Sequence, residues 1–307
     1  MTRFRTATRV AAVVVAALAC AAPAPATADD GWLPTGQGIV SGVSGLAVAG
    51  SDPAVVDLLA VHDNKHPGEQ RVSRIRLVPG GVPEVEPLRW EGADPVDLEA
   101  LAEVPGRADE FVAFESSGRG FHLRLRPGAV TVVREFTVPG AREAGHHDNY
   151  EGFALVRRWG RTAAVWAHRG QDEEPAVVRS ALVDWATLTF GPPESRTVTV
   201  PYPAEHVRHI SDIEITATGE VLTSAASDPG DDGPFDSGLY AVGRITSSPF
   251  TGPGFAPYDT PVALGVRTGH KVEAVACRAG TPTTVLGSDD EHLGGAVRPD
   301  GICPGDG

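Results

Sequence analysis

One glutamate recurs at a similar place in several parts of this chain of 307 residues. The windows that contain it are VDLEALA from 96, DNYEGFA from 148, SDIEITA from 211 and HKVEAVA from 270. Their central residues are Glu99, Glu151, Glu214 and Glu273, and a similar window, SGVSGLA from 41, carries Ser44 instead. A carboxylate can ligate a metal ion, transfer a proton or accept hydrogen bonds. The repeat therefore marks a candidate site as well as a structural unit.

A second apolar run follows every window and ends in polar residues. These runs are LLAVHDN from 58, FVAFESS from 111, AVWAHRG from 164, VLTSAASD from 221 and TVLGSDD from 284. In an antiparallel pair the start of the first strand lies beside the end of the second. We therefore expect acids that close the second runs, such as Asp63 and Asp289, to lie near the window glutamates.

The spacing of the windows predicts the architecture. Successive centres lie 55, 52, 63 and 59 residues apart, an interval typical of the blades of a β-propeller. The 36 glycines and 26 prolines punctuate the chain, and no long segment has apolar residues at helical spacing. We predict an all-β propeller with five blades, or alternatively six, in which segment 31–40 supplies an outer strand to the last unit and closes the ring.

Such a ring would gather the acids at one mouth of a central channel. Clustered carboxylates must be protonated, hydrogen-bonded or neutralised by a cation. We predict a divalent metal, with calcium first and zinc, manganese or iron as alternatives. Its expected ligands are Asp63, Glu99, Glu151, Glu214, Glu273 and Asp289. The alternative is that each glutamate accepts hydrogen bonds from backbone N–H groups of the adjacent blade and so joins the blades together.

Basic residues and histidines are predicted at the same mouth. Lys65, Arg119 and Arg169 follow the second runs and would hold an anionic substrate beside the metal, unless they only form salt bridges. His147 precedes one window and His168 closes one second run. Either imidazole would serve as a general acid or base.

The N-terminus has the pattern of an export signal. Three arginines precede an apolar stretch, residues 10–22, that is too short to span a bilayer. We predict a signal peptide at 1–28, a propeller domain at 29–307 and a secreted protein, with a lipid anchor on Cys20 as the alternative.

The composition narrows the partners and predicts one covalent link. Cys277 and Cys303 are the cysteines left after signal removal, and we predict a disulfide between them. The net charge of −14 argues against nucleic-acid binding, which needs clustered Lys and Arg. We expect a monomer that does not touch the membrane once its signal is removed.

Several of these runs resemble a known family. SGLA, LLAVHDN and SRIRLV, together with VDLEALA and FVAFESSGRG, are similar to the phytase-like propeller proteins described as having esterase-like activity. This resemblance implies a propeller, calcium ions and hydrolysis of phosphate or carboxylic esters. Metal-dependent sugar lactonases also carry an E-G dipeptide on an inner propeller strand, as in Glu151 and Gly152, so lactone hydrolysis is a second enzymatic interpretation.

The resulting hypothesis is a metal-assisted hydrolase that takes a small anionic or ester substrate at one mouth of the channel. The alternative is a non-catalytic propeller that binds a ligand or partner on the same face. Replacing Glu151 and Glu214 by glutamine separates the two, since lost activity with a retained fold favours the enzyme, whereas a lost fold favours a structural role.

Overall fold

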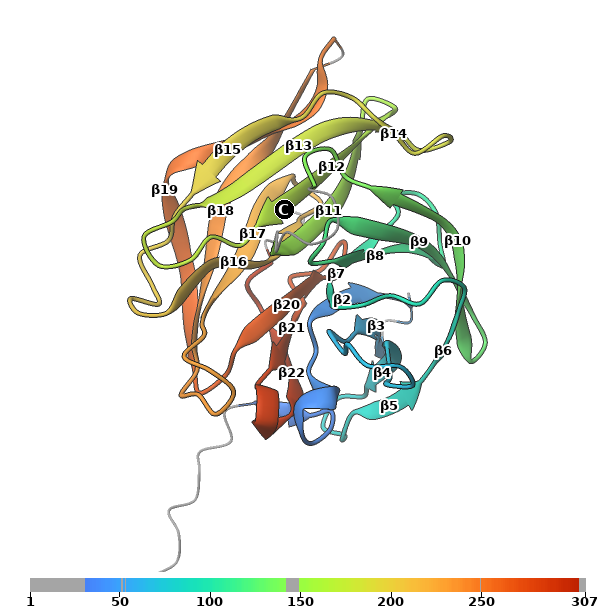
Figure 1. Cartoon of the computed structure of the whole chain (residues 1–307), viewed down its shortest axis with the longest axis vertical. Coiled ribbons are helices and arrows are strands. Elements are labelled where there is room, and N and C mark those ends of the chain that lie inside the picture. The colour runs from blue at the N-terminus through green and yellow to red at the C-terminus, as the bar shows by residue number, and fades with distance from the viewer. Residues whose placement is uncertain (1–30, 51, 53, 142–148, 249, 304–307) are drawn as a thin grey trace, which may run out of the picture. The chain divides into compact units, whose positions relative to one another are not determined.

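The computed structural model describes residues 31–50, 52, 54–141, 149–248 and 250–303. The predicted signal peptide at 1–28 and His147 lie outside these residues. The unit that begins at Gly31 consists of five β-sheets arranged in a ring (Figure 1). The prediction of a five-bladed all-β propeller is confirmed.

The first two blades follow one another along the chain. Blade 1 contains β2 (Gly45–Val48), β3 (Val56–Val61), β4 (Val72–Leu77) and β5 (Glu84–Pro87). Blade 2 contains β7 (Leu98–Glu103), β8 (Glu110–Glu115), β9 (Arg119–Arg126) and β10 (Ala129–Thr137), with β6 (Arg89–Glu91) parallel to β10. In each blade the first strand is innermost and the following strands add outwards in antiparallel pairs.

Blades 3 and 4 repeat this plan with longer outer strands. Blade 3 contains β11 (Tyr150–Arg158), β12 (Arg161–His168) and β13 (Ala176–Asp184), and both β14 (Thr189–Phe190) and β15 (Glu194–Val198) pair with β13. Blade 4 contains β16 (Val207–Ile215), β17 (Glu220–Ser227), β18 (Asp236–Ser248) and β19 (Gly252–Thr268).

Blade 5 joins the two ends of the propeller. It contains β20 (Val272–Cys277), β21 (Thr284–Asp289), β22 (Gly295–Asp300) and β1 (Leu33–Pro34). β1 pairs antiparallel with β22, as predicted, so the outer edge of this sheet is covered by the N-terminal segment. Two short 3₁₀-helices, η1 (Ile39–Ser41) and η2 (Glu291–Leu293), contact each other at this junction (Figure 1).

Small residues let the inner strands approach closely. Each inner strand contacts the next, and β20 contacts β2 to complete the ring. A Cβ atom added to Gly45 would lie 2.7 Å from the backbone nitrogen of Leu101, and one added to Gly152 would lie 3.1 Å from that of Ile213. Glycine is therefore required at both places, where the backbones of adjacent blades meet.

Apolar side chains fill the space between neighbouring blades. Between blades 2 and 3, the rings of Phe114 and Phe153 lie 4.8 Å apart, and both are almost fully buried. Burying each such ring stabilises the fold by about 2–3 kcal/mol. Similar clusters lie between the other pairs of blades, so the core is a series of interfaces around the channel.

The C-terminal segment is held covalently. Cys277, at the end of β20, is disulfide-bonded to Cys303, which confirms the predicted link. Among the described residues, no helix is long and apolar enough to cross a bilayer.

Candidate functional site

Three of the four window glutamates lie at the start of inner strands. Glu99, Glu151 and Glu273 each sit where the register shifts between the first and second strands of a blade. Such a β-bulge re-aims one side chain out of the regular alternation. The three residues are 9%, 2% and 2% exposed. Both Glu151 and Glu273 raise the pKa of Glu99 by charge repulsion, so the three carboxyl groups converge.

Glu214 does not join this group, and its predicted equivalence is wrong. In β16 the register shift spans the residues between Arg208 and Asp212. Leu101, two residues after Glu99, lies beside Gly45 of the preceding blade. Ile213 lies beside Gly152 in the same way. Ser211, two residues before Ile213, therefore occupies the position of the glutamates. Glu214 follows three residues later, near the other end of the channel.

The environment of Glu214 matches the structural alternative instead. Its carboxylate accepts a hydrogen bond from the backbone of Cys277 on the adjacent blade. Burial raises the pKa of Glu214 well above its usual range, and the nearby carboxyl of Glu103 adds to that effect. The contact links blade 4 to blade 5, as a structural glutamate would.

We use the name charged mouth for the end of the channel where acids and cations gather. Its acids are Asp63, Asp97, Glu99, Glu151, Asp228, Glu273, Asp289 and Glu291. Its cations are Lys65, Arg169, Arg208 and Lys271. The acids outnumber the cations, so the mouth is electronegative even after every cation has found a partner.

Arg208 is the central cation of the charged mouth. Its NH1 atom lies 2.9 Å from Oε1 of Glu273 and 3.8 Å from Oε1 of Glu151, and its NH2 atom donates to Asp228. Burial alone would lower the pKa of Arg208, but these carboxylates raise it above its usual range. Because its partners come from blades 3, 4 and 5, Arg208 joins three blades electrostatically.

The remaining cations are also paired. Nζ of Lys271 lies 3.0 Å from Oε1 of Glu273 and also contacts Glu291. Arg169 donates to Oε1 of Glu151 at 3.0 Å. Lys65 lies 2.9 Å from Asp97 and 3.7 Å from Asp63 and is the most exposed of the four cations, with 56% of its side chain accessible.

Glu99 differs from the other two glutamates. No described residue forms a hydrogen bond or ion pair with its carboxyl group. Burial raises the pKa of Glu99 well above its usual range, and repulsion from Glu151, Asp97, Glu273 and Asp63 raises it further. A raised pKa favours the neutral form of Glu99, which can donate a hydrogen bond or a proton.

Glu151 and Asp289 are two further buried acids of the charged mouth. Oε2 of Glu151 is buried and has no hydrogen-bond partner among the described residues. Asp289 accepts a hydrogen bond from the backbone of Glu291 at 3.0 Å. Burial raises the pKa of Asp289 well above its usual range, and Glu273 and Asp63 raise it further.

Only some of the other predicted substrate-binding and catalytic residues lie at the charged mouth. Lys65 and Arg169 reach the charged mouth, whereas Arg119 pairs with Glu135, lies 3.7 Å from Glu115 and covers the Phe121 ring in blade 2. His168 ends β12, where its Nδ1 accepts a hydrogen bond from the backbone of Gly170 at 3.2 Å. Its ring lies beside Tyr150, the neighbour of Glu151.

The charged mouth does not fit a preformed metal site. Within the described part of the chain, no three His, Cys, Asp or Glu side chains are grouped so that they could hold a metal ion. The guanidinium of Arg208 lies between Glu151 and Glu273, and the ammonium of Lys271 pairs with Glu273 and Glu291. Calcium binding here stays a prediction, and no step below uses a metal.

Sequence reasoning missed several residues of the site. Arg208 was overlooked because it precedes its window instead of following a second run. Asp97 stands two residues before Glu99, and Asp212 stands in the same D-x-E relation to Glu214. That short repeat was a usable signal. Asp212 accepts hydrogen bonds from the backbone of Val275 and of Ile213, so it joins blades 4 and 5.

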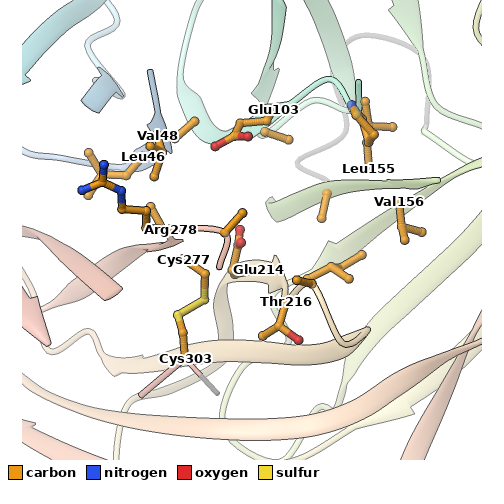
Figure 2. Close-up of a pocket in the computed structure, with 18 of the residues that line it drawn as sticks. Leu46, Val48, Glu103, Leu155, Val156, Glu214, Thr216, Cys277, Arg278 and Cys303 are labelled. Atoms are coloured by element: carbon orange, nitrogen blue, oxygen red, sulfur yellow. A yellow bond between two sulfur atoms is a disulfide. The ribbon is translucent and has the colours of Figure 1, made fainter. Parts of the chain in front are cut away.

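A cavity opens at the opposite end of the channel, which we call the far mouth (Figure 2). Its volume is 220 Å³, and it is lined by the last residues of the inner strands. Glu103 and Glu214 face it from different blades, and the Cys277–Cys303 disulfide lies at its edge. Burial raises the pKa of Glu103 to about 7, although a backbone hydrogen bond from Val48 lowers it.

Comparison with solved structures finds many similar chains. No protein-family model matches the chain, and no curated protein matches it. A structure described as a glycoside hydrolase superposes with a TM-score of 0.49 and 11% sequence identity, and the match covers 86% of this chain and 62% of that one. The chain thus spans less than two thirds of that protein's length. A likeness of this degree supports no inference about activity.

Proposed function

We propose that this propeller is a secreted hydrolase that cleaves carboxylic or phosphate esters at the charged mouth, with Glu99 as its general acid. The observation that carries the proposal is the environment of Glu99. It is a buried carboxyl without a hydrogen-bonding or ionic partner among the described residues, and its pKa is raised by burial and by neighbouring acids. A general acid must hold its proton at the working pH, and such surroundings provide that condition.

Glu151 is the complementary group. Arg169 and Arg208 lie beside its Oε1 atom, while Oε2 has no hydrogen-bond partner among the described residues. As a water oxygen bonds to the carbonyl carbon or phosphorus, its proton passes to Oε2 of Glu151. Glu99 gives its own proton to the leaving oxygen as the ester bond breaks. Exchange with solvent then restores both groups.

The cations of the mouth would orient the substrate. Lys65 is the accessible one and can contact an anionic or polarised oxygen in the open part of the channel. Arg208 lies deeper and would stabilise negative charge that develops on the reacting group. Carboxylates that remain uncompensated would disfavour a highly charged substrate, so we propose a neutral carboxylic ester or a singly charged phosphate diester.

Leaving-group dependence tests the role of Glu99. Purified mature protein is assayed with alkyl and 4-nitrophenyl esters of acetate and phosphate, with and without a chelator. Glu99→Gln should lower kcat by about 10²–10⁴-fold for alkyl leaving groups, which need protonation, and much less for 4-nitrophenolate. Glu135→Gln, on the exposed outer strand of blade 2, should leave both rates unchanged. Absence of turnover by the wild type, or an equal loss for both leaving groups, would contradict the proposal.

A non-catalytic ligand-binding propeller is the second candidate. It is favoured by the ion pairs of Arg208 and Lys271, which suit a rigid charged socket as well as an active site. The two mouths provide a matched comparison, because Glu151 and Glu214 lie on neighbouring inner strands but at opposite ends of the channel. Glu151→Gln should abolish turnover in an enzyme, whereas Glu214→Gln should affect only stability.

A further inference from the structure

A second charged cavity lies away from the channel, between blades 2 and 3. Its volume is 420 Å³. It is lined by the turn between β7 and β8, the turn between β11 and β12, and the end of β13. β7 and β11 begin at the charged mouth, so their opposite ends place this cavity on the other face of the propeller. It shares no residue with the site proposed for hydrolysis.

Three arginines line this cavity: Arg107, Arg157 and Arg161. The guanidinium of Arg157 forms no hydrogen bond or ion pair with any described residue, and its NH1 atom lies over Gly106, the neighbour of Arg107. Arg161 lies on the other face of the β11–β12 hairpin, and its guanidinium donates to the backbone carbonyl of Phe250 at 3.3 Å. The guanidinium of Arg157, beside the turn that carries Arg107, is therefore the donor left open at this cavity in a protein whose net charge is −14.

The acids around these arginines do not neutralise them. Arg107 lies 3.3 Å from Glu110, but that carboxylate also binds Arg124 at 2.7 Å and His122 at 2.9 Å. Asp184 is the one carboxylate among the described residues that line the cavity, and it accepts a hydrogen bond from the backbone of Ala186. The cavity therefore keeps excess positive charge.

The backbone around the cavity accommodates the arginines. Gly252 has a φ of +77°, and a Cβ atom there would lie 2.9 Å from Leu182 and 3.1 Å from Cδ of Arg161. Only glycine lets the Arg161 stem pack in this position. Gly106, with a φ of +76°, lies under the NH1 atom of Arg157, 3.7 Å from where its Cβ would be. Arg157 and Arg161 flank the tight turn at Trp159 and Gly160 but lie on opposite faces of the hairpin, because Arg161 pairs with Arg158.

We infer that this cavity binds an oxyanion, namely a phosphate, sulfate or carboxylate group carried by a small ligand. Guanidinium groups offer paired N–H donors in a planar fork that matches two oxygens of such a group. Excess positive charge inside an acidic protein makes the cavity the favourable place for an anion on this face. The inference does not depend on the hydrolase proposal, because the two sites lie on different faces.

Calorimetry with inorganic phosphate tests this inference, and sulfate and acetate distinguish the three anion classes. Arg157→Gln should weaken phosphate binding at least tenfold, whereas Arg161→Gln, at a guanidinium that already donates to Phe250, should weaken it much less. Arg157→Lys keeps the charge but loses the fork, so it should give an intermediate Kd. Arg196→Gln, on the exposed strand β15 where Arg196 pairs only with its neighbour Glu194, is the matched control and should bind phosphate as the wild type does.

Two further outcomes keep the test decisive. Phosphate bound at the charged mouth would be lost in Lys65→Gln and retained in Arg157→Gln, and that result would overturn the inference. So would the absence of saturable binding of all three anions by the wild type. Arg157 has no partner to lose among the described residues, so its glutamine variant should keep the wild-type thermal unfolding temperature, which confirms that any lost affinity is local.

Discussion

Replacing Arg208 by methionine should destabilise the propeller in a pH-dependent way. Methionine keeps the length of the side chain and removes its charge. The substitution takes one cation away from Glu151, Asp228 and Glu273, whose carboxylates come from three blades. The Arg208 side chain is 13% exposed and those of Glu151 and Glu273 are 2% and 3% exposed, so solvent cannot replace the lost partner.

The size of the stability loss depends on which cationic partners each carboxylate retains after the substitution. Removing one partner of a buried ion pair costs about 3–5 kcal/mol. Here Glu151 retains Arg169 and Glu273 retains Lys271, so we expect a loss near the lower limit, about 3 kcal/mol at pH 8. Burial raises the pKa of Glu273 to about 7, although Lys271 and Arg208 lower it. At pH 5 this group is therefore neutral in either protein, and the loss should fall to about half its value at pH 8.

Urea unfolding at pH 5 and pH 8 measures this difference. With a slope of about 3 kcal/mol per molar urea, the midpoint at pH 8 should fall by about 1 M. Arg196→Met is the control, because Arg196 and Glu194 form an exposed pair at 3.2 Å whose loss should cost less than about 0.5 kcal/mol. Equal losses at both pH values, or a loss no larger than the control, would refute the electrostatic role of Arg208.

Other predictions concern the whole fold. The free energy of unfolding should decrease as pH rises from about 4.5 to about 7. Burial raises the pKa values of Glu103 and Glu273 to about 7, so the folded state binds these two protons more tightly than the unfolded state. An unfolding temperature that increases with pH over this range would contradict the prediction. Cys303→Ser, which opens a link spanning 26 residues, should cost about 3.5 kcal/mol in chemical unfolding. Gly152→Ala should cost about 1–3 kcal/mol by forcing blades 3 and 4 apart, whereas Gly254→Ala, with open space around it, should leave the unfolding temperature unchanged. Calcium, if it binds as predicted from the sequence, should raise the unfolding temperature in a chelator-reversible way, and an unchanged temperature would oppose a resident ion.

The ring could be predicted because a propeller repeats one unit. Each window lies on an inner strand, and each second apolar run pairs with it, so five units imply five blades. The segment that closes blade 5 was predictable for the same reason, since the last unit lacks an outer strand and a sheet edge needs cover. The disulfide followed from an even count of cysteines and the pattern of an export signal.

The residues at the charged mouth were harder to predict. The letters SDIEITA match the other windows, but the longer bulge before Asp212 moves Glu214 three residues along the strand. A bulge changes register without changing composition, so alignment by letters cannot detect it. Side-chain pairing was also hidden, because Arg208 meets Glu273 across 65 residues of sequence and two blades.

The symmetry of the propeller is broken where chemistry is proposed. Five equivalent places surround the charged mouth, and two of them hold Ser44 and Ser211 instead of glutamate. In blade 4 the serine is accompanied by Arg208, which binds the glutamates of blades 3 and 5. Glu99 in blade 2 forms no ion pair with a described residue, and burial together with repulsion from the other acids raises its pKa. Five identical carboxyl groups would titrate as one set, whereas this arrangement raises the pKa of one beside others that are ion-paired, and acid–base catalysis requires such a difference.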